Sequence, residues 1–426
     1  MPGGSGDQSV ISTDTSDPAE RRTSTRHLSD GAARLDVTAV GSCEAYLVVS
    51  VVEPLTAVGA VSGVWGAVAE SLAGSGLIVV HERVFGGLTA AGEALAARAK
   101  ALQARGVDPS GPVTYVEGRP PWGDGLAGII IRAVAPASLE GPVREIGEPG
   151  RLRGRTWSSG GATFVVLQDV RDAQATSSSP QGRAMSVRRM IREAERLLRE
   201  RGFSYRDVVR TWFYLPDILA WYPAFNAARN ELYEEYGLMP IPGVGARLLP
   251  GSTGIEGRML GSSSPGLDLA VVVAPESSAV RVRRLSSPVQ IEAFRYGSAF
   301  ARAVLVERPG CSTIHVSGTA AVDEAGVSLN GGDFHAQVEH TLERIAALLE
   351  PEGADLTDIV AATAYVKRAE YAGILAEVLA AQRLAELPAV CVVADVCRDE
   401  LLFEMEAEIA LARPPSSASL PAHHGS

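Results

Sequence analysis

The sequence has few of the residues that build disulfide frameworks or metal sites. Its 426 residues include only four cysteines and seven histidines. The cysteines are too sparse for a disulfide scaffold, and no two of them form the C-x2-C pair typical of zinc sites. His335 and His340 are five residues apart, which places them on different faces of a helix. We therefore expect no metal, and no other cofactor.

Long apolar runs and basic stretches are also missing. Each apolar segment is interrupted by Glu, Gly or Pro well before the ~18 residues that a transmembrane helix needs. Lys and Arg total 39 against 50 Asp and Glu, which gives a formal net charge of -11. No basic stripe carries interleaved aromatic residues. These absences argue against membranes and nucleic acids as partners, although a local arginine pocket can still bind a small anion.

The two ends of the chain are poor in apolar residues and rich in Ser and Pro. The first stretch, MPGGSGDQSVISTDTSDPAERRTSTRHLSD, has no apolar core of the kind that a signal peptide needs. We predict a disordered tail over residues 1–34 and a second one over 414–426. The expected location is the cytoplasm.

What the sequence does contain is a repeated order of strands and helices. DIVAATAYVKRAEYAGILAEVL and DVVRTWFYLPDILAWYPAFNAA share one pattern, and a weaker copy precedes them. We predict three similar units, over residues 38–136, 157–275 and 288–413, in the α/β (α+β) class with helices packed on one face of a mixed sheet. Two unrelated α/β domains are the alternative. The predicted helices cover 61–73, 90–105, 186–201, 221–236, 333–349 and 371–385.

The third unit resembles the YjgF/Rid family. The resemblance is carried by Gln337 and Thr341 in its first helix, an L-x-D-I-V turn from Leu356, the LPA of 387–389 and the terminal FEMEAEIAL. It implies a chorismate-mutase-like fold, which other members assemble into trimers with small-molecule sites between subunits. Three units in one chain would then form an internal pseudo-trimer within a monomer.

The chain as a whole, from about residue 38 to 413, is similar to the chorismatases. GRPPWGDGLAG, WYPAFNAARNELYEEYG, STGIEG, FRYGSAFARA, SGTAA and ADVCRDELLFEME carry this resemblance. It implies cleavage of the enolpyruvyl ether of chorismate to pyruvate and a cyclic acid, often for secondary-metabolite biosynthesis. We predict 3-hydroxybenzoate as the ring product. A dihydroxycyclohexadiene carboxylate from hydrolysis, a Rid-type imine deaminase and a non-catalytic small-molecule binder remain the alternatives.

Cleavage of a vinyl ether starts by protonation of its terminal carbon, so it needs a carboxylic acid that stays protonated near neutral pH. In LLFEMEAEIAL, Glu404, Glu406 and Glu408 alternate with apolar residues and share one face of a strand. The pattern alone favours a solvated acidic face. The Rid resemblance instead implies that Glu404 is the active-site acid, while Glu406 and Glu408 keep the solvated interpretation.

Two cysteines compete for a place beside this acid. Cys397, in ADVCRDE, fits the chorismatase branch in which a cysteine near the glutamate is associated with formation of 3-hydroxybenzoate. Cys391, in LPAVCV, matches a cysteine position of Rid proteins. A free cysteine is more often a small buried hydrophobe, and we keep that alternative open for Cys397.

The two carboxylates of chorismate call for cationic anchors, and arginine binds carboxylates in a bidentate way. Arg247, in GVGARLLP, falls where Rid proteins place their carboxylate-binding arginine, and Val390 takes the corresponding place in the third unit. For the other candidates a solvated strand face or a polar turn is the alternative. These further substrate-binding candidates are Arg302, Tyr296, Arg210, Tyr214, Ser252 and Thr253.

Overall fold

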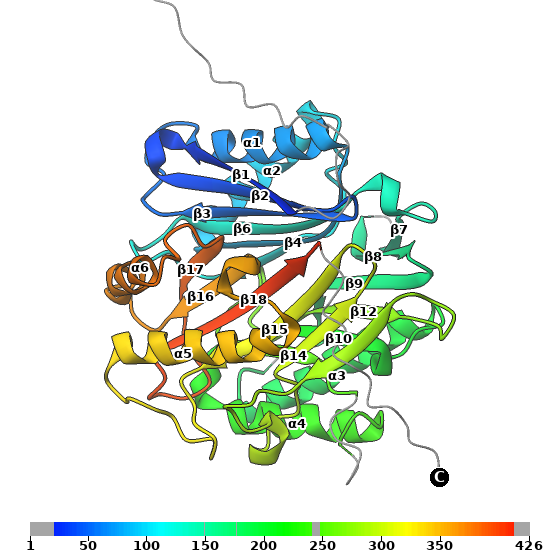
Figure 1. The fold of residues 1–426 in the computed structure, drawn as a ribbon, viewed down its shortest axis with the longest axis vertical. Helices are drawn as coiled ribbons and strands as arrows, with labels where there is room; N and C mark the ends of the chain where they lie inside the picture. Colours follow the sequence, from blue (N-terminus) through cyan, green and yellow to red (C-terminus); the bar gives the residue numbers. More distant parts are fainter. Residues whose placement is uncertain (1–20, 149, 176, 241–247, 413–426) are drawn as a thin grey trace, which may run out of the picture.

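A computed structural model of the chain describes residues 21–148, 150–175, 177–240 and 248–412. Their strands form three six-stranded sheets, in the orders β1-β2-β3-β6-β4-β5, β7-β8-β9-β12-β10-β11 and β13-β14-β15-β18-β16-β17. The second and third orders repeat the first with the numbers advanced by six and by twelve. The predicted fold of repeated mixed-sheet units is therefore confirmed (Figure 1).

Each unit has the same succession of three strands, a helix, a strand, a second helix and two closing strands. The first unit comprises β1 (Arg21–Leu28), β2 (Ala33–Val40), β3 (Glu44–Val51), α1 (Ala60–Ser75), β4 (Ile78–Gly86), α2 (Ala91–Ala104), β5 (Thr114–Glu117) and β6 (Leu126–Val134). The second comprises β7 (Arg144–Glu148), β8 (Arg151–Ser159), β9 (Ala162–Arg171), α3 (Pro180–Arg199), β10 (Val208–Tyr214), α4 (Tyr222–Glu235), β11 (Gly251–Ile255) and β12 (Gly266–Val273). The third comprises β13 (Arg281–Leu285), β14 (Ala303–Glu307), β15 (Ser312–Ala320), α5 (Phe334–Leu349), β16 (Ile359–Val366), α6 (Tyr371–Ala381), β17 (Ala389–Val393) and β18 (Phe403–Leu411).

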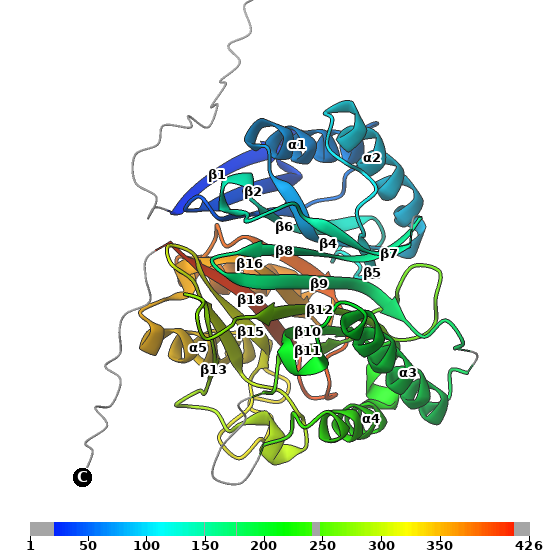
Figure 2. The ribbon, with the colours of Figure 1, turned by 90° about the vertical axis from the view of Figure 1, so that its right-hand side faces the viewer.

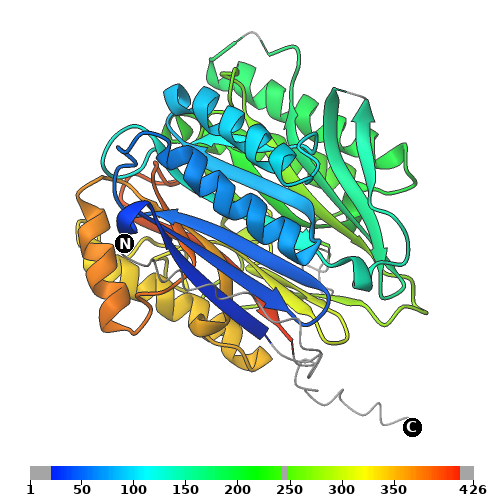
Figure 3. The same cartoon turned by 90° about the horizontal axis from the view of Figure 1, so that it is seen from above.

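The helices lie on the outside and the sheets turn their other faces toward one another (Figure 2). Seen from above, α1 and α2 run side by side over the first sheet (Figure 3). β11 packs beside β15, and β17 packs beside β3, so each of these pairs joins two units. This arrangement buries both faces of each sheet, one under its helices and one against its neighbours. Among the described residues, no helix is both long and apolar enough to span a membrane.

Local sequence explains where the helices begin. Asp333 caps α5 by accepting a hydrogen bond from the Ala336 amide, and the buried Val338, Leu342 and Ile345 confirm the predicted apolar face. α3 begins at Pro180, six residues before the predicted start, because Ser179 caps it and proline fits the first helical turn. All six predicted helices are present in the structure.

The predicted unit boundaries start too late. β1 lies within the stretch predicted as a disordered tail, so that prediction is wrong for residues 21–34, and β7 and β13 precede the predicted starts at 157 and 288. These are edge strands, whose sequences RRTSTRHL, REIGE and RVRRL carry little apolar pattern. β1 pairs along its whole length with β2, and Thr25 donates a hydrogen bond to Asp36. Backbone pairing, rather than burial of side chains, holds such strands.

Buried polar groups join the units where their sheets meet. Glu44 of the first unit forms ion pairs with Arg132 at 2.7 Å and with Arg308 of the third unit at 2.8 Å, and it accepts a hydrogen bond from Thr313 at 2.9 Å. Burial alone would raise the pKa of Glu44, but the two guanidinium groups outweigh it and hold that pKa well below its usual range. Glu44 is therefore an ionised link between two units.

Replacing this link should destabilise the whole chain. We expect Glu44→Gln to lower the free energy of unfolding by about 3–5 kcal/mol, because two buried guanidinium groups lose their counter-charge. The midpoint of urea unfolding measures the effect. Glu70→Gln, which removes an exposed pair with Arg26, should change it by less than about 1 kcal/mol. Equal midpoints for the two variants would contradict the role given to Glu44.

Candidate active site

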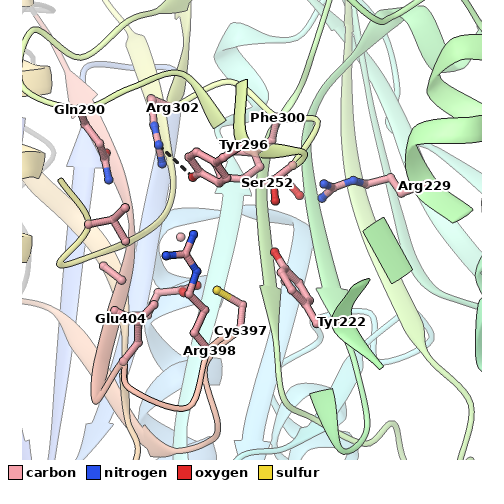
Figure 4. Close-up of a pocket in the computed structure, with 16 residues that line it drawn as sticks. Tyr222, Arg229, Ser252, Gln290, Tyr296, Phe300, Arg302, Cys397, Arg398 and Glu404 are labelled. Carbon is pink, nitrogen blue, oxygen red and sulfur yellow. Dashed lines mark hydrogen bonds between the residues drawn. The ribbon is translucent and has the colours of Figure 1, made fainter. Parts of the chain in front are cut away.

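A cavity lies between the second and third units, and about 570 Å³ of empty space, part of it open to solvent, lies among its lining atoms. One wall comes from α4 and β11, and the other comes from β15, the start of β18 and the loops before β14 and β18 (Figure 4). The lining residues are Tyr222, Arg229, Ser252, Gly254, Gln290, Tyr296, Ser298, Phe300, Arg302, Gly318, Ala320, Val322, Cys397, Arg398, Leu401 and Glu404.

Glu404 is a buried carboxyl group facing this cavity. It lies at the start of β18, opposite Tyr365 of β16 and Ala320 of β15, and is 5% exposed. Burial raises its pKa to about 8, the negative charge of Glu406 adds to the shift, and Arg210 opposes it. A Cβ at Gly318 would collide with Glu404 Oε1, so the glycine of the SGTAA segment leaves room for the carboxyl group. At neutral pH Glu404 therefore holds a proton.

Glu406, two residues further along β18, is in the opposite state. Arg83 of the first unit and Arg210 of the second each place a guanidinium nitrogen 2.6 Å from its carboxylate. Thr253 and Thr363 also donate hydrogen bonds to it. Burial alone would raise the pKa of Glu406, but the two arginines outweigh burial and lower it to about 2. A permanent carboxylate thus lies next to the neutral acid, an arrangement that separates the pKa values of two neighbouring carboxyl groups.

The expectation that Glu406 and Glu408 lie on a solvated face is wrong. They are 2% and 8% exposed, because this face of β18 turns toward the other two sheets. Glu408 pairs with His315 of β15. The alternation of acidic and apolar residues identifies two faces of the strand, and both of them are buried.

Three arginines reach the cavity without a carboxylate partner among the described residues. Arg302 donates to the Ile291 carbonyl and, at 2.9 Å, to the Tyr296 hydroxyl. Arg398 donates to the Gly326 carbonyl and the Ser328 hydroxyl. Arg229, only 1% exposed, contacts the Asn226 amide oxygen at 2.7 Å.

Buried arginines elsewhere in the chain, such as Arg83, Arg98 and Arg132, are paired with glutamates. An unmatched buried guanidinium is costly, so the cavity is suited to an anionic ligand that supplies the missing charge. Figure 4 shows Arg229 on one side of the cavity and Arg302 and Arg398 on the other. Two separated anionic groups on one ligand would match this arrangement.

Of the two competing cysteines, Cys397 lines the cavity and Cys391, on β17, does not. Burial raises the pKa of Cys397 to about 12, with a further increase from the charge of Glu404. The Cys397 side chain is therefore a neutral thiol. With Tyr222, Tyr296 and Phe300 it gives the cavity a largely apolar wall beside the acid.

The predicted site residues divide into four groups. Glu404, Cys397, Arg302, Tyr296 and Ser252 line the cavity. Arg210 and Thr253 lie behind it and bind Glu406 instead of facing the open space. Tyr214 is buried outside the cavity lining, where burial raises its pKa above the usual range. Arg247 lies outside the described residues.

Arg247 and Val390 were expected to be equivalent positions in the second and third units. The strand pairings of these units show a different equivalence. Val390 of β17 pairs with Thr363 of β16, and Thr253 of β11 pairs with Trp212 of β10. Trp212 and Thr363 occupy the same place in the two repeated modules. Thr253 is therefore the counterpart of Val390.

Sequence reasoning missed several cavity residues, and Arg229 and Arg398 are the most important. Arg229 lies seven residues after Tyr222 in WYPAFNAARNELYEEYG, a spacing of two helical turns that places both side chains on one face of α4. That spacing could have identified Arg229 from the sequence as a residue on the same helix face as Tyr222. Arg398 directly follows Cys397 in an irregular loop, where no periodic pattern points to it. Gln290 and Phe300 likewise come from irregular segments.

The other two units have no acid at the position of Glu404. Glu404 pairs with Tyr365, and the corresponding pairs are Gly128 with Phe85 and Gly266 with Tyr214. A Cβ at Gly128 would collide with Val390, and one at Gly266 would collide with Met259. Both equivalent positions are filled by a neighbouring side chain, so the acid belongs to the cleft between the second and third units.

The raised pKa of Glu404 predicts how stability depends on pH. Between its ordinary pKa of 4.5 and about 8, the folded protein holds a proton that the unfolded chain releases, so wild-type stability falls as pH rises through this window. Glu404→Gln cannot ionise and escapes this loss. We therefore compare the melting temperature of the variant minus that of wild type at two pH values. We expect this difference to be roughly 5 °C or more larger at pH 9 than at pH 5. Calorimetry would test this, with the exposed Glu370→Gln as the control; a constant offset for Glu404→Gln would contradict a buried neutral acid.

Comparison with known proteins agrees with the fold of the chain. The family model for Endoribonuclease L-PSP matches residues 299–411, which is most of the third unit. A chorismatase of Streptomyces rapamycinicus is 26% identical over 231 residues, 48% of this chain and 65% of that protein. A chorismatase of Streptomyces hygroscopicus is 26% identical over 234 residues, 49% of this chain and 63% of that protein. The match thus covers less than two thirds of either relative.

The three-dimensional comparison extends over more of the chain. A chorismatase crystal structure superimposes with a TM-score of 0.55 and 20% identity, covering 78% of this chain and 93% of that structure. This superposition shows a shared fold. Taken together, the comparisons show that the chain is similar to chorismatases in sequence and in fold, and that its third unit is similar to the Endoribonuclease L-PSP family.

Proposed function

We propose that the protein is a chorismatase that cleaves the enolpyruvyl ether of chorismate and releases pyruvate. The observation that carries this proposal is the neutral, buried Glu404 in a cavity lined by guanidinium groups that have no carboxylate partner within the described part of the chain. A proton donor surrounded by positive charge suits an anionic substrate that must be protonated on carbon. The similarity to chorismatases supports the same reaction.

Chorismate is a dicarboxylate, and the cavity has cationic groups on two sides. Arg302 and Arg398, both beside the Tyr296 ring, are suited to bind one carboxylate, and Arg229 on α4 is suited to bind the other. The aromatic wall would pack against the ring. Because α4 and the loop before β18 belong to different units of one chain, a monomer supplies both sides of the cavity.

The reaction would begin with transfer of the Glu404 proton to the terminal methylene carbon of the enolpyruvyl group. The resulting oxocarbenium ion is stabilised by the carboxylate that Glu404 has become, in a cavity that excludes most water. An oxygen nucleophile, either water or the ring 4-hydroxyl, then attacks the cationic carbon. The bond between that carbon and the C3 oxygen of the ring then breaks. This releases pyruvate if water attacked, and leaves the pyruvyl group on the C4 oxygen, to depart with that oxygen, if the ring hydroxyl attacked.

We further propose that the ring product is 3-hydroxybenzoate. On this route the ring 4-hydroxyl attacks, its oxygen leaves within pyruvate, and the ring loses its C3 proton as it becomes aromatic, so no water is consumed. The neutral Cys397 thiol lies on the cavity wall next to Glu404 and would occupy the space that an attacking water needs. Attack by water would instead give the dihydroxycyclohexadiene carboxylate.

Loss of the acid should abolish catalysis. We expect Glu404→Gln to reduce pyruvate release from chorismate by at least about 100-fold, because amide and acid have similar shapes but only the acid donates the proton. In wild type, kcat/KM should fall as pH rises through about 8, where Glu404 loses its proton. A coupled lactate dehydrogenase assay measures both.

The matched control is Glu400→Gln, which lies in the loop just before β18, is exposed and is outside the cavity lining. It should retain wild-type pyruvate release. Undiminished release by Glu404→Gln would remove the proposed proton donor. Wild-type protein that releases no pyruvate at all would exclude the chorismatase reaction and favour a non-catalytic binder or an imine deaminase.

The choice of ring product should depend on Cys397. We expect Cys397→Ala to convert a product that is mainly 3-hydroxybenzoate into one in which the dihydroxy acid is a major component, because the smaller side chain admits water. Mass spectrometry separates the two acids, which differ by one water. Cys391→Ala, outside the cavity lining, should leave the ratio unchanged. If Cys397→Ala gives the wild-type ratio, another residue controls the product.

A further inference from the structure

Two thiols from different units meet away from the candidate active site. Cys43 lies in the turn between β2 and β3 of the first unit, and Cys311 lies in the turn between β14 and β15 of the third. The two thiols are close enough for each to shift the pKa of the other, and Arg308 lies 2.8 Å from Glu44, the neighbour of Cys43, and 3.3 Å from Cys311 Sγ. Next to them, Thr313 donates a hydrogen bond to Glu44 at 2.9 Å, which holds the two turns in register.

The two cysteines differ in exposure and in charge state. Cys43 is half-buried beside the exposed Ser42, whereas Cys311 is fully buried. Hydrogen bonding from Cys311 lowers the pKa of Cys43; burial opposes this, and Arg308 reinforces it. The hydrogen bond to Cys43, together with burial, raises the pKa of Cys311. Arg308 Nη2 also lies 3.3 Å from Cys311 Sγ. A half-buried thiol with a lowered pKa thus lies next to a fully buried one, the arrangement of an attacking and a resolving cysteine.

We propose that Cys43 and Cys311 are an oxidation site at which hydrogen peroxide forms a disulfide between the first and third units. The Cys43 thiolate attacks one peroxide oxygen, giving a sulfenic acid and hydroxide. The Cys311 thiol then attacks the Cys43 sulfur, forming the S–S bond and releasing water. In total two thiols are oxidised, one peroxide is reduced, and two waters leave.

The other two cysteines should not compete. Burial raises the pKa of both Cys391 and Cys397 to about 12, so neither has appreciable thiolate character at neutral pH. A thiol rather than a thiolate reacts slowly with peroxide. Oxidation is therefore directed to Cys43, whose pKa is lowered, and not to Cys391 or Cys397, whose pKa values are raised.

The disulfide would act on stability and leave catalysis unchanged. Ser312 pairs with Leu411 at the end of β18, whereas Ala320 pairs with Glu404 at its start. Seven residues of strand span about 23 Å, so the thiol pair is far from the proposed proton donor. The bond would close a very long loop of chain, which restricts the unfolded state strongly.

Peptide mapping of the full-length chain tests the proposal. The folded protein is treated with stoichiometric hydrogen peroxide, remaining thiols are blocked with N-ethylmaleimide, and the digest is analysed by mass spectrometry. We expect a Cys43–Cys311 linked peptide pair, two hydrogens lighter than the separate peptides and split by dithiothreitol, with Cys391 and Cys397 blocked. The melting temperature of the oxidised protein should rise by about 5 °C or more and return on reduction.

Two variants separate the steps. Cys311→Ser should accumulate a Cys43 sulfenic acid that dimedone labels. Cys43→Ser should leave Cys311 as a free thiol. Neither variant should gain thermal stability from peroxide. Pyruvate release, where present, should be the same before and after oxidation, so the test does not depend on the proposed function. Recovery of Cys43 and Cys311 as separate blocked thiols, or of a Cys43 sulfinic acid beside a free Cys311, would overturn the proposal.

Discussion

The carboxylate of Glu406 is the point at which the three units depend on one another. It lies on β18 of the third unit, and its charge is balanced by Arg83 from the first unit and Arg210 from the second. A buried carboxylate is tolerated only when paired, so none of the three groups can be buried this way without the other two. The same charge raises the pKa of Glu404. The contact that joins the units therefore also prepares the proposed acid.

Fusion of three units into one chain allows the three equivalent clefts to differ. In a symmetric trimer every cleft has the same residues, whereas here the acid position is glutamate in one unit and glycine in the other two. Val390 and Met259 occupy the space next to the two glycines. One cleft contains a cavity with the proposed proton donor, and the other two contribute packing.

The sequence predictions succeeded where a structure leaves a local pattern in the sequence, and failed where it does not. Helices were predicted because burial of one helical face imposes a periodic pattern, as Val338, Leu342 and Ile345 show in α5. The edge strands β1, β7 and β13 were missed because backbone pairing needs no such pattern. Glu404 and Cys397 were found through resemblance to a family. Arg398 was missed because its irregular loop carries no local signal.

The sequence by itself determined the repeat, the helices and the alternation that places Glu404, Glu406 and Glu408 on one face of β18. Those are local properties, set by the two-residue and 3.6-residue periods of strands and helices. Only the tertiary structure decided which of these glutamates is neutral. A pKa depends on burial and on charges within a few ångströms, and the arginines beside Glu406 come from β4 and β10, far away along the chain.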